Sequence, residues 1–266
     1  MSRQIDRRTF IQCSAGAAGF SAAQTSGIPP RSIPRRGGRM SVLGLGAGSL
    51  HRMSESDSIQ LLQTAYLNGV TWFDAAAAYG AGAAETRIGK ALHGVRNRIF
   101  LSSKTLRRDK QNALQDLRAS LQRLQTDALD LWMIHDLRTE DEWRRIAQPG
   151  GALQALQEAK QNGRARYVGL SAHRNPDLVL RAMQTFPFDF IMTPVDAGFT
   201  SKVLPCAHRS QIGVLAIRVL GLPTKKQRTE GDVRRSIQSA LSLPVAGAAI
   251  GCETLQQLHE NLKAVL

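Results

Sequence analysis

Four polar side chains lie at or near the ends of short apolar runs and belong to types that together can move a proton. Asp74 ends the run VTWFD, Lys104 ends RIFLSSK and His135 ends ALDLWMIH, while Tyr79 follows Asp74 across a run of alanines. A tyrosine hydroxyl titrates near pH 10 in water, so it donates a proton more readily when a neighbouring ammonium stabilises the phenolate. Lys104 is a side chain of that type, and a carboxylate at Asp74 would hold it charged.

His135 adds a group that can hydrogen-bond a carbonyl oxygen or join a proton relay. A site of this composition protonates a carbonyl oxygen as negative charge develops there, which is half of a reduction. No side chain can supply the hydride, so the pattern implies a nicotinamide cofactor. Each residue alone has a plain structural explanation: a strand-end Asp caps helices, a Tyr packs half-buried, and Lys and His are solvated. Their joint placement at consecutive runs favours catalysis.

The elements that position these residues are visible as an alternating pattern along the chain. Apolar runs of strand length alternate with segments whose apolar residues recur with the period of a helix. The runs cover residues 41–46, 70–74, 98–104, 128–135, 165–171, 188–194, 213–218 and 245–251, and clear helical segments cover 58–69, 113–125, 151–163 and 253–266. Eight strands in strict alternation with helices predict a (β/α)8 TIM barrel, in which catalytic groups sit at the carboxyl ends of the strands.

Several of these segments resemble the aldo/keto reductase family from about Val42 to the end of the chain. They are FDAAAAYGAGAAETRIGKAL, LSSKT, LDLWMIHD, GRARYVGLSAH and AIGCETLQQLHEN. The resemblance implies that Asp74, Tyr79, Lys104 and His135 are the catalytic four. Tyr79 would be the acid in reduction and the base in the reverse direction, and the substrate would be a small carbonyl compound or a sugar.

The same resemblance implies where a cofactor would bind. Two amide side chains that the family uses on the nicotinamide are replaced by Ala172 and Met192, while Ile217 replaces an aromatic residue under the ring. These replacements keep an alternative open, a catalytically weak or inactive barrel that acts as a nucleotide- or protein-binding module. The implied cofactor contacts are Ser171, Met192, Ile217, Arg218, Gly251, Cys252, Glu253, Gln257 and Asn261.

The choice between NADH and NADPH depends on the residues near the ribose. Glu253 lies where many relatives have a basic or small residue, and an acid there would repel a 2′-phosphate or accept from a 2′-hydroxyl. That favours NADH. Arg218 could compensate for Glu253, so both cofactors remain possible.

The first residues resemble a twin-arginine (Tat) export signal. Arg7 and Arg8 precede a mild apolar stretch, Phe10–Ala23, that is rich in Ala, Gly and Ser. Residues 1–24 are therefore expected to engage the Tat machinery and to direct the protein to the periplasm. A disordered basic arm, or a short helix on an acidic surface, is the alternative. The stretch is too short for a stable membrane anchor, and residues up to 40 predict a signal and linker before a barrel over 41–266.

The formal net charge of +14 includes +6 from residues 1–40, which hold seven Arg and one Asp. The remaining basic residues are spread over helix faces without an aromatic stripe, so nucleic acid is not an expected partner. The cysteines show no spacing typical of a metal site, and Cys206 and Cys252 are expected to be buried thiols. The barrel region is short for this fold, which predicts shortened loops, an open site and a missing or shortened amino-terminal hairpin.

Overall fold

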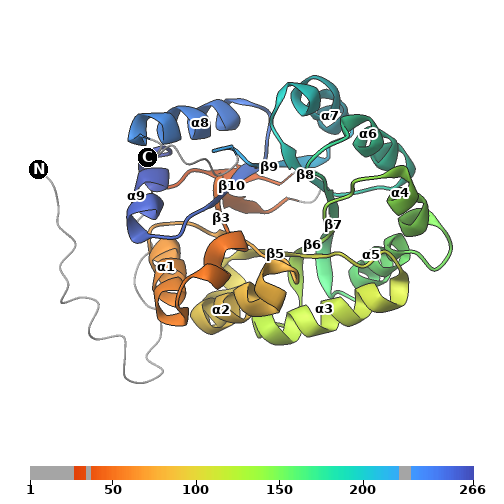
Figure 1. Ribbon diagram of the computed structural model, residues 1–266, viewed down its shortest axis with the longest axis horizontal. Coiled ribbons are helices and arrows are strands. Elements are labelled where there is room, and N and C mark those ends of the chain that lie inside the picture. The colour runs from red at the N-terminus through yellow and green to blue at the C-terminus, as the bar shows by residue number, and fades with distance from the viewer. Residues whose placement is uncertain (1–26, 34–36, 222–228) are drawn as a thin grey trace, which may run out of the picture.

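The computed structural model describes residues 27–33, 37–221 and 229–266, so the predicted export signal lies outside the described residues. Eight parallel strands close into a barrel surrounded by helices (Figure 1). The barrel strands are β3 (Leu43–Gly46), β4 (Trp72–Asp74), β5 (Phe100–Thr105), β6 (Leu129–Ile134), β7 (Ala165–Ser171), β8 (Phe190–Pro194), β9 (Gly213–Ile217) and β10 (Gly247–Gly251). They follow one another in chain order, and β10 pairs with β3 to close the ring. The predicted TIM barrel is confirmed, with one strand in each apolar run.

Helices cover the outside of the barrel. They are α1 (Glu55–Leu67), α2 (Ala83–Leu92), α3 (Lys110–Leu124), α4 (Glu140–Ala147), α5 (Ala152–Gln161), α6 (Pro176–Thr185), α7 (Ala197–Arg209), α8 (Glu230–Ser242) and α9 (Leu255–Lys263), with short 3₁₀ helices η3 (Ala47–Arg52), η4 (Tyr79–Gly82) and η5 (His93–Arg98). Side-chain hydrogen bonds cap the amino-terminal ends of several helices. Asp109 caps α3 and Thr254 caps α9. None of the described helices is long and apolar enough to cross a membrane.

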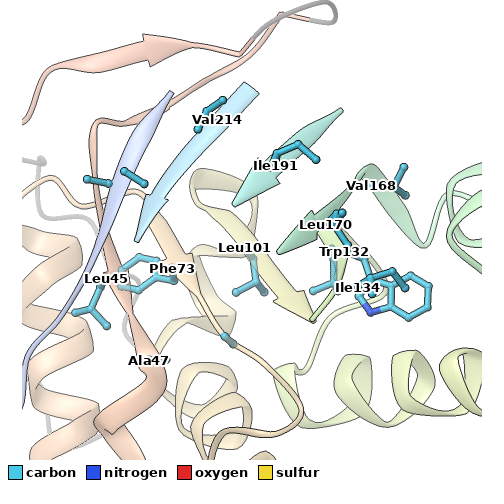
Figure 2. Close-up of a cluster of buried hydrophobic side chains, with 14 of the residues drawn as sticks. Leu45, Ala47, Phe73, Leu101, Trp132, Ile134, Val168, Leu170, Ile191 and Val214 are labelled. Atoms are coloured by element: carbon cyan, nitrogen blue, oxygen red, sulfur yellow. The ribbon is translucent and has the colours of Figure 1, made fainter. Parts of the chain in front are cut away.

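Side chains alternate between the two faces of each barrel strand, as a period of two requires. The outward residues pack against the helices and form the larger buried cluster (Figure 2). The labelled residues of this cluster in Figure 2 are Leu45, Ala47, Phe73, Leu101, Trp132, Ile134, Val168, Leu170, Ile191 and Val214.

The inward residues form a second, smaller cluster inside the barrel. The rings of Phe100, Tyr167 and Phe190 lie 5.5 to 6.0 Å apart. Gly44 leaves space for the Trp72 indole, because a Cβ at Gly44 would lie 2.2 Å from the indole carbon Cε3. This half of the barrel is therefore filled with large apolar side chains.

The same alternation turns the polar strand-end residues toward the barrel axis. Asp74 comes two residues after the inward Trp72, and His135 comes two after the inward Met133. Lys104 comes four residues after the inward Phe100. The polar residues at the ends of these three strands therefore lie together, next to the aromatic side chains inside the barrel.

The amino-terminal hairpin, which was predicted to be missing or shortened, is present, and each of its strands has three residues. Strands β1 (Pro30–Ser32) and β2 (Arg39–Ser41) pair antiparallel within the stretch predicted as a linker. The buried side chains of Ile33 and Met40 join the inner cluster, and Tyr167 donates a hydrogen bond from its hydroxyl to the carbonyl of Gly37 at 2.7 Å. The sequence did not reveal the hairpin because three-residue strands are too short to show alternation.

Candidate active site

A buried ion pair joins the ends of β4 and β5. The ammonium nitrogen Nζ of Lys104 lies 2.6 Å from Oδ2 of Asp74, and both side chains are almost fully buried. Ser102 donates a hydrogen bond to the other carboxylate oxygen at 2.7 Å, and the Trp72 indole donates to Ser102 at 3.1 Å. Lys104 also donates to the carbonyl of Ala75 at 2.7 Å. Both charges are therefore compensated and held in a fixed geometry.

Tyr79 reaches this pair through the alanine run. The backbone N–H of Ala75 donates to Ser102, and that of Ala77 donates to Lys104, at 2.9 and 3.2 Å. Small side chains allow this close approach of the loop to β5. The ring centroid of Tyr79 consequently lies 5.1 Å from Nζ of Lys104. The local sequence after Asp74 thus joins two members of one site.

The surroundings of Tyr79 and Lys104 set the protonation states of these two side chains. Burial raises the pKa of Tyr79, and this outweighs the ammonium of Lys104, which lowers it. Burial also works against the charged form of Lys104, but the carboxylate of Asp74 and the phenol raise the Lys104 pKa above its ordinary value. At neutral pH Tyr79 keeps its proton and Lys104 stays charged. Tyr79 is therefore a neutral phenol rather than a phenolate.

His135 faces Tyr79 across the same space. The two ring centroids lie 5.6 Å apart and the rings are nearly perpendicular. Burial and the charge of Lys104 lower the pKa of His135 to about 3, so the imidazole is neutral. Its Nδ1 is enclosed and has no hydrogen-bond partner among the described residues. Arg108, which the sequence did not single out, donates to the carbonyls of His135 and Asp136 at 2.9 and 3.1 Å and fixes the backbone there.

All thirteen residues that the sequence singled out line one cavity of about 830 Å³. Besides the catalytic four they are Ser171, Met192, Ile217, Arg218, Gly251, Cys252, Glu253, Gln257 and Asn261. This volume lies within the range of small-molecule and cofactor sites. The structure therefore brings the predicted residues together, and their individual roles stay predictions.

The far end of the cavity contains an ion pair that the sequence could not reveal. Arg52, at the end of η3, lies with its Nη1 3.3 Å from Oε1 of Glu253. Gln257 accepts from the backbone N–H of Glu253 at 2.8 Å. Arg218 affects another group: its charge is, after burial, the largest effect on His173 and lowers the pKa of that imidazole. Arg52 is the cation that pairs with Glu253, and compensation by Arg218 in NADPH binding stays a prediction.

Two further residues at the catalytic end were missed as site candidates. His173 follows β7 and lines the cavity, with its Nδ1 enclosed and without a partner. Gly48 lies beside Tyr79, because a Cβ there would be 3.8 Å from the phenol ring. Neither residue belongs to a periodic pattern, so only the folded arrangement identifies them.

Cys252 is buried and Cys206 is half-buried, and both are free thiols. Burial raises the pKa of the Cys252 thiol to about 12, so it is not a nucleophile at neutral pH. Within the described residues, no group of three or more His, Cys, Asp or Glu side chains is arranged to hold a metal ion.

The fold and the site define a TIM barrel whose cavity is lined by a protonated tyrosine and a buried lysine–aspartate pair. The chain belongs to the aldo/keto reductase family, whose model matches residues 42–266. It is 29% identical over 235 residues to the aldo-keto reductase YhdN of Bacillus subtilis (strain 168), covering 77% of this chain and 68% of that protein.

Solved structures of other aldo-keto reductases share the fold. The aldo-keto reductase AKR11C1 from Bacillus halodurans, in its holo form, superimposes with a TM-score of 0.76 at 23% identity over 90% of this chain and 91% of that one. An aldo/keto reductase from Klebsiella pneumoniae in complex with NADP and acetate superimposes with a TM-score of 0.72 at 21% identity, over 88% and 89% of the two chains.

Proposed function

We propose that this protein is an NAD(P)H-dependent oxidoreductase that reduces an aldehyde or ketone, or oxidises the corresponding alcohol, with Tyr79 as the general acid or base. One observation carries the proposal: the phenol of Tyr79 lies beside the buried pair of Lys104 and Asp74 on the wall of a large cavity. Family membership supports the same reaction class.

The side chains divide the work of proton transfer. A substrate carbonyl oxygen placed between Tyr79 and His135 would receive the phenolic proton as its negative charge develops. The ammonium of Lys104 stabilises the phenolate that remains, and Asp74 keeps this ammonium charged within the apolar barrel. Neutral His135 orients the carbonyl by a hydrogen bond without adding a charge.

The cavity fits a nicotinamide cofactor, which when bound supplies the hydride. Met192 and Ile217 give the catalytic end apolar walls against which a flat ring can pack, and Ser171 has a hydroxyl there. Gly46 and Gly251 lie on adjacent strands, and a Cβ on either would lie only about 3.4 to 3.6 Å from the other's backbone. Their missing side chains leave the backbone open to a diphosphate, while Glu253, Gln257 and Asn261 would meet the adenosine half.

A binding-only barrel is a second candidate, and Met192 is the observation that favours it. Its thioether lines the cavity where an amide was expected, and Ala172, whose side chain is buried, offers no amide either. Loss of two amide hydrogen bonds weakens cofactor binding by about 1 kcal/mol each. The intact set of Tyr79, Lys104, Asp74 and His135 favours the enzyme.

Binding of NADH and NADPH to the full chain, followed by nucleotide fluorescence, tests the proposal together with turnover of a generic aldehyde. We expect at least one nucleotide to bind, and the Tyr79→Phe variant to bind it equally well while its kcat falls by about 10²-fold or more. Binding without turnover would support the binding-only barrel. Absence of binding at millimolar nucleotide would contradict the enzyme and would leave a protein-binding barrel as the remaining candidate.

A further inference from the structure

One cation at the catalytic end of the cavity lacks a counter-charge. Of the described residues that line the cavity, Lys104 is paired with Asp74 at 2.6 Å and Arg52 with Glu253 at 3.3 Å. The guanidinium of Arg218 makes no ion pair or hydrogen bond with any described residue. A cation on a cavity wall that pairs with none of the described residues is available to an anionic ligand.

The backbone holds Arg218 in a conformation that favours glycine. Its φ is +54°, although the residue carries a long side chain. Gly221 donates its backbone N–H to the carbonyl of Arg218 at 2.7 Å and closes a tight turn there. Left-handed residues other than glycine cluster at ligand sites, where the strain serves to aim a side chain. Here the turn follows directly after the inward-facing Ile217.

His173 supplies a neutral polar group at the same end. Its Nδ1 is enclosed, so Nε2 is the ring nitrogen that can meet a ligand in the cavity. Burial and the charge of Arg218 lower its pKa, so the imidazole is uncharged at neutral pH. The nearby carboxylate of Asp136 does not neutralise Arg218, because Arg138 holds it at 2.5 Å.

We propose that Arg218 and His173 form a subsite for a carboxylate group of the substrate, so that the preferred carbonyl substrates are carboxylated. The guanidinium would bind the carboxylate with two N–H donors, and Nε2 of His173 would donate a third hydrogen bond. Arg218 is an exposed residue of the cavity wall, so a ligand that enters the cavity can reach its side chain. The inference rests on the proposed carbonyl reduction, since the carboxylate is placed relative to the reacting carbonyl.

Succinate semialdehyde and its methyl ester test the subsite, because they carry the same aldehyde and differ by one charge. The wild-type chain should prefer the acid in kcat/KM. Arg218→Gln should lower kcat/KM for the acid about tenfold to a hundredfold more than it lowers kcat/KM for the ester. His173→Phe should reduce the same preference, and His173→Gln, which keeps an N–H donor, should restore part of it.

Arg209→Gln is a matched control. Arg209 ends α7 before β9 begins, whereas Arg218 follows the end of β9, so both changes remove one positive charge from opposite ends of one strand. Arg209→Gln should leave the preference for the acid unchanged. An equal loss in both variants would show a general effect of charge and would overturn the proposal.

The diphosphate of the cofactor is the other anion that Arg218 could bind. If Arg218→Gln weakens NADPH binding and lowers kcat/KM for acid and ester by the same factor, Arg218 serves the cofactor and the substrate subsite is wrong. If Arg218→Gln leaves NADPH affinity unchanged and abolishes only the preference for the acid, the subsite is supported.

Calorimetric binding of benzoate to the cofactor-free chain separates the subsite from the proposed function. Benzoate that binds the wild type and the Arg209→Gln variant, but not Arg218→Gln, supports the subsite even if no aldehyde is reduced. Turnover of the ester without preference for the acid, and without benzoate binding, would leave the reductase standing and overturn the subsite.

Discussion

Lys104 and Asp74 form an ion pair of 2.6 Å that is almost fully removed from solvent. Lys90 and Glu55 form a pair of nearly the same length, 2.7 Å, on the protein surface. Water screens the surface pair, whereas the buried charges depend on each other. Two ion pairs with similar geometry therefore contribute very differently to folding and to chemistry.

Removal of Asp74 should expose this dependence. Asp74→Ala leaves the ammonium of Lys104 buried without its partner, which destabilises the fold by about 3 to 5 kcal/mol or forces Lys104 to lose its proton. Thermal unfolding followed by circular dichroism measures the effect. Glu55→Gln breaks the surface pair and should leave Tm almost unchanged. A similar Tm for both variants would show that Asp74 does not compensate a buried charge.

A buried carboxylate on α2 should position Tyr79 without contacting the substrate. Glu85 is fully buried, accepts from Ser103 at 2.5 Å and from Arg123 at 2.7 Å, and so ties the helix after Tyr79 to the strand of Lys104. Glu85→Ala should lower stability by about 3 to 5 kcal/mol because Arg123 loses its partner. Glu85→Gln still accepts the hydrogen bond from Ser103, so this variant should retain part of the lost stability. A positioning role would be supported if kcat falls across the two Glu85 variants in parallel with their Tm while their nucleotide affinity stays unchanged.

The pKa of His135 predicts a specific dependence of stability on pH. The folded-state pKa is about 3, below the ordinary value of 6.5, so the unfolded chain binds more protons between these two values. Stability should therefore be full above pH 6.5 and should fall as the pH drops toward 3. In His135→Gln this contribution is absent. The wild type should lose more stability than the variant between pH 6.5 and 4.5 in urea unfolding, while parallel curves would mean that His135 is not held neutral by the fold.

The ion pair of Arg52 and Glu253 predicts the basis of cofactor preference. The carboxylate of Glu253 would repel a 2′-phosphate. It also pairs with Arg52, the one described cation near this end of the cavity. Glu253→Gln frees Arg52 and should raise the affinity for NADPH relative to NADH by about tenfold. Glu260→Gln changes the charge of the same cavity without touching Arg52 and is the control. If neither variant shifts the ratio of the two dissociation constants, Glu253 does not face the ribose.

Much of the barrel and of the site could be predicted from the sequence. Each apolar run contains a strand, and its last inward residue lies at the carboxyl end, which is why Asp74, Lys104 and His135 meet. The pairing of Arg52 with Glu253 could not be predicted, because two hundred residues separate them and only the closed ring brings them together. The upward shift of the Tyr79 pKa could not be predicted from the sequence either. Burial raises this pKa more than the charge of Lys104 lowers it, and burial is a property of the fold.

An export signal in residues 1–24 would link the compartment of the protein to its mechanism. Residues 1–24 carry Arg7 and Arg8 ahead of a mild apolar stretch, so a reporter fused to residues 1–40 should reach the periplasm. Changing Arg7 and Arg8 to Lys keeps the charge and should abolish export if the Tat machinery reads the arginine pair. Arg35 and Arg36 form a second pair outside the signal, and their change to Lys should have no effect. Export that survives the first change would reject the Tat route. Because nicotinamide cofactors are scarce outside the cytoplasm, an exported reductase would have to bind its cofactor before transport or use another electron source. The first case predicts slow nucleotide dissociation from the full chain.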